Sequence, residues 1–210
     1  MSDTHDVSGR RSRYAMEAHS GRFIDPTLIQ PEDVLIEDIA YHLAGICRFS
    51  GACRVNVADH PVRVAKLVEL FGGCPASQYE GLMHDAHEYV LNDMTAPLGR
   101  QEFMKPFETL KVSVQRAIDT ALPGPSHHPK CEQDPTWCKT ADTLSALLEA
   151  DALLPSKGRD WSCGTPYLYG LVEEYRDYFP ELYGPREPSA TESEIEFLRV
   201  WNTLRKGETL

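Results

Sequence analysis

Two histidines and two aspartates, spread over three segments of this chain, form a candidate metal site. In chain order they are His60, His84, Asp85 and Asp142. The first ends the phrase Val-Ala-Asp-His, the adjacent pair lies in Leu-Met-His-Asp-Ala-His-Glu, and the last ends Cys-Lys-Thr-Ala-Asp. Imidazole and carboxylate groups suit divalent ions such as Zn, Co, Mn or Mg. Because such a set leaves positions for water and substrate, we predict a catalytic rather than a structural ion.

Apolar spacing around each of these residues is typical of a helix. We predict helices over residues 57–71, 77–91 and 136–154, so that three helices project ligands into one interhelical pocket. The remaining predicted helices are one that ends before Gly51 and those over residues 103–121, 165–178 and 191–204. No segment alternates like a strand over any length, so the sequence predicts an all-α helical bundle.

The composition predicts one domain in the cytoplasm. A chain of 210 residues suits a single core, and we expect residues 1–20 to be a flexible tail and residues 21–210 to form the domain. We find no apolar run of membrane-spanning length and no apolar stretch of a secretory signal. The six cysteines are therefore expected to be thiols. A net charge of −11 argues against nucleic-acid polymers as partners, although a small phosphorylated ligand remains compatible with it.

Two further carboxylates are candidates for catalysis. Glu88 comes four residues after His84, which on a continuous helix places it on the same face, where a carboxylate can hold and deprotonate an attacking water. Asp93 follows the predicted helix and can position the leaving group. The alternatives are that Glu88 is a solvated helix residue and that Asp93 is a turn or cap residue.

These phrases, with Ile-Cys-Arg-Phe-Ser-Gly and Asn-Asp-Met-Thr-Ala-Pro-Leu, resemble the HD-domain metal-dependent phosphohydrolases. The resemblance covers roughly residues 20–155 and is greatest to the branch of bacterial 5′-deoxynucleotidases and phage deoxyadenosine triphosphohydrolases (dATPase). It implies an HD-domain bundle whose H…HD…D pattern is the four-residue set above. It further implies that Glu88 activates water and that Asp93 supports catalysis.

The resemblance also assigns the phosphate contacts. It implies that Arg48 binds phosphate, with Arg54 as the alternative, and that Lys139 matches a phosphate-contacting lysine of the phage enzymes. The competing interpretation of Arg48 and Lys139 is an ordinary ion pair. Many members have a lysine where this chain has Gly99, so the choice among mono-, di- and triphosphates stays open, with Arg100 as a replacement.

For the base, the resemblance implies an apolar clamp of Phe23, Ile24 and Pro97. The alternative is that Phe23 and Ile24 anchor their loop in the core.

Together these features predict a metal-dependent hydrolase of deoxynucleoside 5′-phosphates that releases the nucleoside with phosphate or triphosphate. The resemblance implies a homo-oligomer, in the host cytoplasm if the chain is phage-encoded. The alternative function is a non-catalytic HD module that binds a nucleotide or a partner protein through the same pocket.

Overall fold

Helix α2 (Asp59–Leu70) is the central element, because two of its faces are buried in different hydrophobic clusters. The computed structural model describes residues 14–126, 136–184 and 188–210. Val62 and Ala65 of α2 pack into one cluster, whereas Leu67 and Val68 pack into the other. The helix that carries His60 is therefore fixed from both sides.

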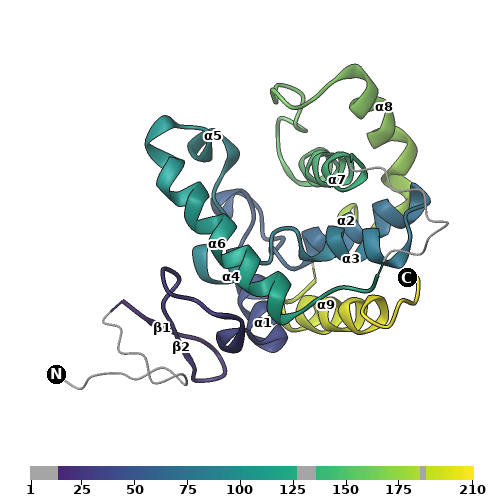
Figure 1. The fold of residues 1–210 in the computed structure, drawn as a ribbon. Coiled ribbons are helices and arrows are strands. Elements are labelled where there is room, and N and C mark those ends of the chain that lie inside the picture. The colour runs from purple at the N-terminus through teal and green to yellow at the C-terminus, as the bar shows by residue number, and fades with distance from the viewer. Residues whose placement is uncertain (1–13, 127–135, 185–187) are drawn as a thin grey trace.

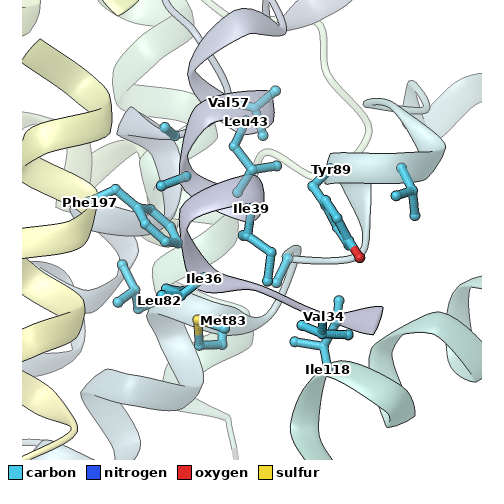
Figure 2. Close-up of a cluster of buried hydrophobic side chains, with 14 of the residues drawn as sticks. Val34, Ile36, Ile39, Leu43, Val57, Leu82, Met83, Tyr89, Ile118 and Phe197 are labelled. Carbon is cyan, nitrogen blue, oxygen red and sulfur yellow. The ribbon is translucent and has the colours of Figure 1, made fainter. Parts of the chain in front are cut away.

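The larger cluster is built around α1 (Ile36–Gly45), whose Ile39 and Leu43 are fully buried (Figure 2). Leu82 and Phe197 pack against them from two other helices. The surrounding helices are α3 (Pro75–Met83), α4 (Glu88–Leu91), α6 (Lys105–Ala121) and α9 (Ala190–Leu204). This cluster holds the segment from α3 to α4, which contains His84 and Asp85.

The smaller cluster joins α2 to α7 (Trp137–Leu153) and α8 (Pro166–Tyr175). In Figure 1, α7 lies over α2 and α3, with α8 beyond it and α9 on the opposite side of the pair. Leu144 and Leu148 of α7 are fully buried there. Helix α7, which carries Asp142, is therefore packed against the helix that carries His60.

Short elements complete the described chain. They are β1 (Met16–Glu17), β2 (Phe23–Ile24), α5 (Ala96–Gly99), and the 3₁₀ helices η1 (Pro31–Asp33), η2 (Phe49–Gly51), η3 (Glu102–Met104), η4 (Arg176–Tyr178) and η5 (Pro180–Leu182). The two strands are antiparallel and pair Met16 with Ile24. The predicted all-α class is confirmed, since this hairpin is the only sheet among the described residues.

The predicted tail of residues 1–20 needs a correction at its inner end. Residues 1–13 lie outside the described ranges, but residues 14–20 belong to the folded part. Ala18 packs into the larger cluster, and the backbone N–H of Ser20 donates to Asp38 over 2.8 Å. The polar composition of residues 14–20 did not predict that they are folded, because the contacts that hold them come from α1.

The helix predicted over residues 77–91 is interrupted at its centre. The chain forms turns over residues 84–87, which separate α3 from α4. Side chains take the carbonyl oxygens that a continuous helix uses: the His84 ring donates to the Gly81 carbonyl, and Gln115 donates to that of Met83. The Met83 oxygen also accepts from the backbone N–H of Ala86, three residues along rather than the four of an α-helix. Glu88 is thus not one regular turn along a common helix from His84.

The other helix boundaries lie within a few residues of those predicted. The last helix begins one residue early, because Ser189 caps it and forms a capping box with Glu192. No helix in the described ranges has both the length and the apolar character needed to cross a membrane.

Candidate metal centre

The four residues of the predicted metal site come together in the structure. One donor atom from each lies within 4.8 Å of those of the other three. His60 projects from the first turn of α2, His84 and Asp85 from the turn after α3, and Asp142 from α7. His60 is fully buried, and the other three side chains are half-buried. Three segments thus bring four donors to one point at the edge of the core.

A buried carboxylate determines which nitrogen of the His60 ring carries the proton. Its Nδ1 lies 2.8 Å from Oε1 of Glu149. Burial opposes ionisation of that carboxyl, but Arg48, His60 and Arg63 outweigh it and hold the pKa of Glu149 well below its usual range. An ionised carboxylate only accepts, so Nδ1–H donates and Nε2 keeps its lone pair. That Nε2 lies 3.1 Å from Oδ1 of Asp142.

The His84 ring has the same tautomer for a different reason. Its Nδ1 donates to the backbone carbonyl of Gly81 over 2.8 Å. Its Nε2 then faces Oδ2 of Asp85 at 3.0 Å and Oδ1 of Asp142 at 3.8 Å. In the described part of the chain this buried Nε2 has no hydrogen bond of acceptable geometry.

This donor set fits a divalent cation. Two imidazole lone pairs and two carboxylates point at one another, and a positive charge between them removes the repulsion. A proton is the alternative: although burial opposes a charged ring, Asp85 and Asp142 hold the pKa of His84 well above its ordinary value. The same proximity depresses the pKa values of Asp85 and Asp142 against the effect of their burial. Zn, Co and Mn all accept this combination of donors.

The sequence analysis did not identify Glu149, whose carboxylate accepts hydrogen bonds from several side chains next to His60. Arg48 Nε donates to its Oε2 over 2.7 Å, and Arg63 donates to Oε1 over 2.9 Å. Ser145 Oγ donates to the same Oε1 over 3.2 Å. The available signal was a carboxylate two turns after Asp142, inside an otherwise apolar stretch of helix. Such partners orient a histidine that binds metal.

Glu88 lies next to the centre, at the start of α4. It is 6% exposed, and its Oε2 has no hydrogen-bond partner within the described ranges. Burial, then the charges of Asp85 and Asp93, raise the pKa of Glu88 to about 9. Asn92 ends α4 with φ of 62°, a conformation that favours glycine, and turns the chain at Asp93. Asp93 is half-buried.

The two predicted phosphate contacts have different surroundings. Arg48 is buried; burial opposes its charge, but Glu149 and then Asp93, Glu88 and Asp85 keep its pKa above the ordinary value. Lys139 bonds Asp142 Oδ2 over 2.6 Å, while its side chain is 80% exposed. The alternative residue, Arg54, is exposed. Arg48 therefore lies among the site carboxylates, and Lys139 lies at their outer edge.

The predicted base clamp is spread over two regions. Ile24, in β2, is 1% exposed and belongs to the larger hydrophobic cluster, which fits the alternative interpretation as a core anchor. Phe23 is half-buried beside it, and Pro97 is exposed in α5. Their role in binding a base stays a prediction.

Comparison with known proteins gives two relatives. The uncharacterized protein RCAP_rcc00048 of Rhodobacter capsulatus is 32% identical over 146 residues, which is 64% of this chain and 70% of that protein. The uncharacterized protein YfdR of Escherichia coli K12 is 37% identical over 87 residues, which is 40% of this chain and 46% of that protein. No protein-family model matches the chain.

Proposed function

We propose that this chain, which belongs to the same family as RCAP_rcc00048 of Rhodobacter capsulatus, is a metal-dependent phosphohydrolase of the HD-domain type. Its substrates are deoxynucleoside 5′-phosphates, and its products are the nucleoside with phosphate or triphosphate. The observation that supports this proposal most is the convergence of His60, His84, Asp85 and Asp142, with both free imidazole nitrogens facing carboxylates.

The roles follow from the chemistry of each group. The four residues would hold a divalent ion, which when bound would lower the pKa of water and polarise a phosphoryl oxygen. The positive charge of that ion would favour the ionised form of Glu88, which orients the attacking water and accepts its proton. Asp93 acts near the scissile ester. Arg48 and Lys139 neutralise the phosphate oxygens.

The distribution of charge supports a phosphate ligand. The whole chain carries a net charge of −11, so a general attraction for anions is absent. Lys139 nevertheless lies 2.6 Å from a metal-site carboxylate, and Arg48 is kept charged by Glu149 and the nearby acids. These two cations, together with a bound divalent ion, make the surroundings of the centre locally attractive to phosphate.

The test is a chromatographic product assay. Metal-stripped protein is reloaded with Mn, Co, Zn or Mg and incubated with every deoxy- and ribonucleoside mono- and triphosphate. We expect metal-dependent release of nucleoside, with orthophosphate from a monophosphate or intact triphosphate from a dNTP. Asp142→Ala should abolish it, whereas Asp177→Ala, which removes an exposed aspartate of η4, should not.

Absence of product from all substrates and ions would refute the hydrolase. Nucleotide binding measured by calorimetry in that case would identify the non-catalytic module instead.

A further inference from the structure

A cavity of about 510 Å³ is lined by residues of α2, η5 and α9. Its volume is that of a binding site for a small organic molecule. None of the four residues of the metal centre lines it. The cavity is therefore a second place where this molecule can hold a ligand.

The charged side chains of this cavity carry an excess of negative charge. They are Asp59, Arg63 and Lys66 of α2, Glu181 of η5, and Glu192 and Glu196 of α9. Four carboxylates against two basic groups give a net charge of −2. Arg63 is also neutralised from outside the cavity, because its Nη2 donates to Glu149 over 2.9 Å. A positively charged occupant therefore fits this lining.

Asp59 shows where such an occupant is needed. It is 8% exposed, and its Oδ2 has no hydrogen-bond partner in the described part of the chain. Arg63 follows one turn along the same helix, but its Nε and Nη2 both donate to Glu149. Ser193 lies close to the Asp59 carboxyl, but its single hydroxyl proton is donated to the Ser189 carbonyl over 3.1 Å. A buried carboxylate oxygen without a donor is costly, which indicates that it accepts from a ligand.

The other carboxylates of the cavity differ in what they already bind. Glu192 Oε2 accepts from the backbone N–H and the hydroxyl of Ser189. Glu196 Oε2 accepts from Arg199 over 2.7 Å. Glu181 is exposed, so a ligand can reach it. A second positive group of the ligand is therefore best placed near Glu181.

The lining suits an organic cation better than a metal ion. Among the described residues, no three donor atoms of this cavity lie within 4.8 Å of one another. Its carboxylates are thus too far apart to surround one ion. Val62 and Pro188 add apolar surface, against which methylene groups can pack. Separate carboxylates together with apolar surface match two ammonium groups joined by an aliphatic chain.

We propose that this cavity binds a linear aliphatic diamine, with one ammonium group bonded to Asp59 and the other close to Glu181. The bond at the buried end is charge-assisted, and such bonds are roughly twice as strong as neutral ones. The two positive charges of the diamine balance the net charge of the lining. Binding here requires neither a nucleotide nor hydrolysis, so it goes beyond the proposed function.

The experiment is a calorimetric titration of the full-length protein with 1,4-diaminobutane. Saturating Mn²⁺ is present, so that the acidic residues of the metal centre do not compete for the diamine. We expect one diamine per chain and no binding of 1,4-butanediol, which has the same chain length without charge. Asp59→Asn should weaken binding at least about tenfold, because it removes the buried charge-assisted bond.

Glu181→Lys tests the exposed end, and it decides the matter even if Asp59→Asn does not fold. We expect it to weaken binding about fivefold, because an ammonium group then meets a positive charge. The matched control is Asp177→Lys, which makes the same change of charge at an exposed residue of η4 outside the cavity lining. Melting curves verify that each variant is folded.

Four results would overturn the diamine site. They are no binding to the wild type, equal binding of 1,4-butanediol, an unchanged affinity in folded Asp59→Asn or in Glu181→Lys, and an equal loss in Asp177→Lys.

Discussion

The two halves of the metal centre are held by different kinds of contact. On the α2 side, His60 is fully buried, and its Nδ1 is bonded by Glu149 from the distant α7. On the turn side, His84 is held by the carbonyl of Gly81, three residues away, and its side chain is 16% exposed. One ligand is thus positioned by tertiary side-chain contacts and the other by local backbone.

Because of this difference, single substitutions should affect the orientation of the two histidines unequally. The Gly81 carbonyl is present whatever the side chain, so the orientation of His84 resists single substitutions nearby. His60 is held at Nδ1 by side chains of α7, with Glu149 at 2.8 Å and Ser145 at 3.1 Å. Loss of the Glu149 carboxyl also leaves Arg48 and Arg63 without their shared partner. We therefore expect the α2 side to be the more sensitive half.

The largest effect is expected from Glu149→Ala. Removing one partner of a buried ion pair costs about 3–5 kcal/mol, because the other charge stays buried and uncompensated. Urea unfolding of the metal-free protein measures it. Glu173→Ala, which removes an exposed carboxylate of α8, is the control and should change the free energy of unfolding little. A loss below about 1 kcal/mol for Glu149→Ala would mean that water solvates the two arginines.

Binding of the metal ion should have the next largest effect on the free energy of unfolding, because the ion contacts ligands from both halves of the centre. At a free concentration one hundred times its dissociation constant, a ligand of the native state adds about 2.7 kcal/mol to the free energy of unfolding. Unfolding with and without Mn²⁺ measures it. Asp142→Asn removes a charge that faces both histidines, so this variant should lose most of the gain. Full stabilisation of Asp142→Asn would place the ion elsewhere.

A smaller effect is expected on the turn side from Gln115→Met. This change keeps the length of the side chain but removes the acceptor of His87 and the donor to the Met83 carbonyl. We expect a loss of about 1 kcal/mol, because Gln115 is half-buried and water can replace part of its bonding. If thermal and urea unfolding showed Gln115→Met to cost more than Glu149→Ala, the ranking of the two halves would be reversed.

The smallest effect on stability is expected from Lys139→Ala. Its side chain is 80% exposed, so its ion pair with Asp142 should contribute less than about 0.5 kcal/mol. If Lys139 binds phosphate, however, the Lys139→Ala substitution should raise KM for the nucleotide while the melting temperature stays unchanged. Steady-state kinetics and a melting curve on one preparation check both. An unaltered KM would leave Lys139 as an ordinary surface ion pair.

The helices were predictable because their apolar residues recur at helical spacing, as around Leu144 and Leu148. The four-residue group was predictable because its flanking phrases are distinctive. The break at residues 84–87 was not, since it depends on Gln115, which reaches the turn from α6. Nor was the role of Glu149, because a spacing of residues does not reveal which distant arginines will meet it.

The bonds between α2 and α7 also bear on the order of events during folding. The residues that they join, His60 with Asp142 and with Glu149, are separated by 82 and 89 positions in the chain. Closing such long loops costs entropy, so these contacts form late unless other packing has already brought the two helices together. An ion that needs the completed set of donors therefore has little to bind in the early collapsed chain. Its effect falls on the rate of unfolding, which it slows, and leaves the rate of folding nearly unchanged.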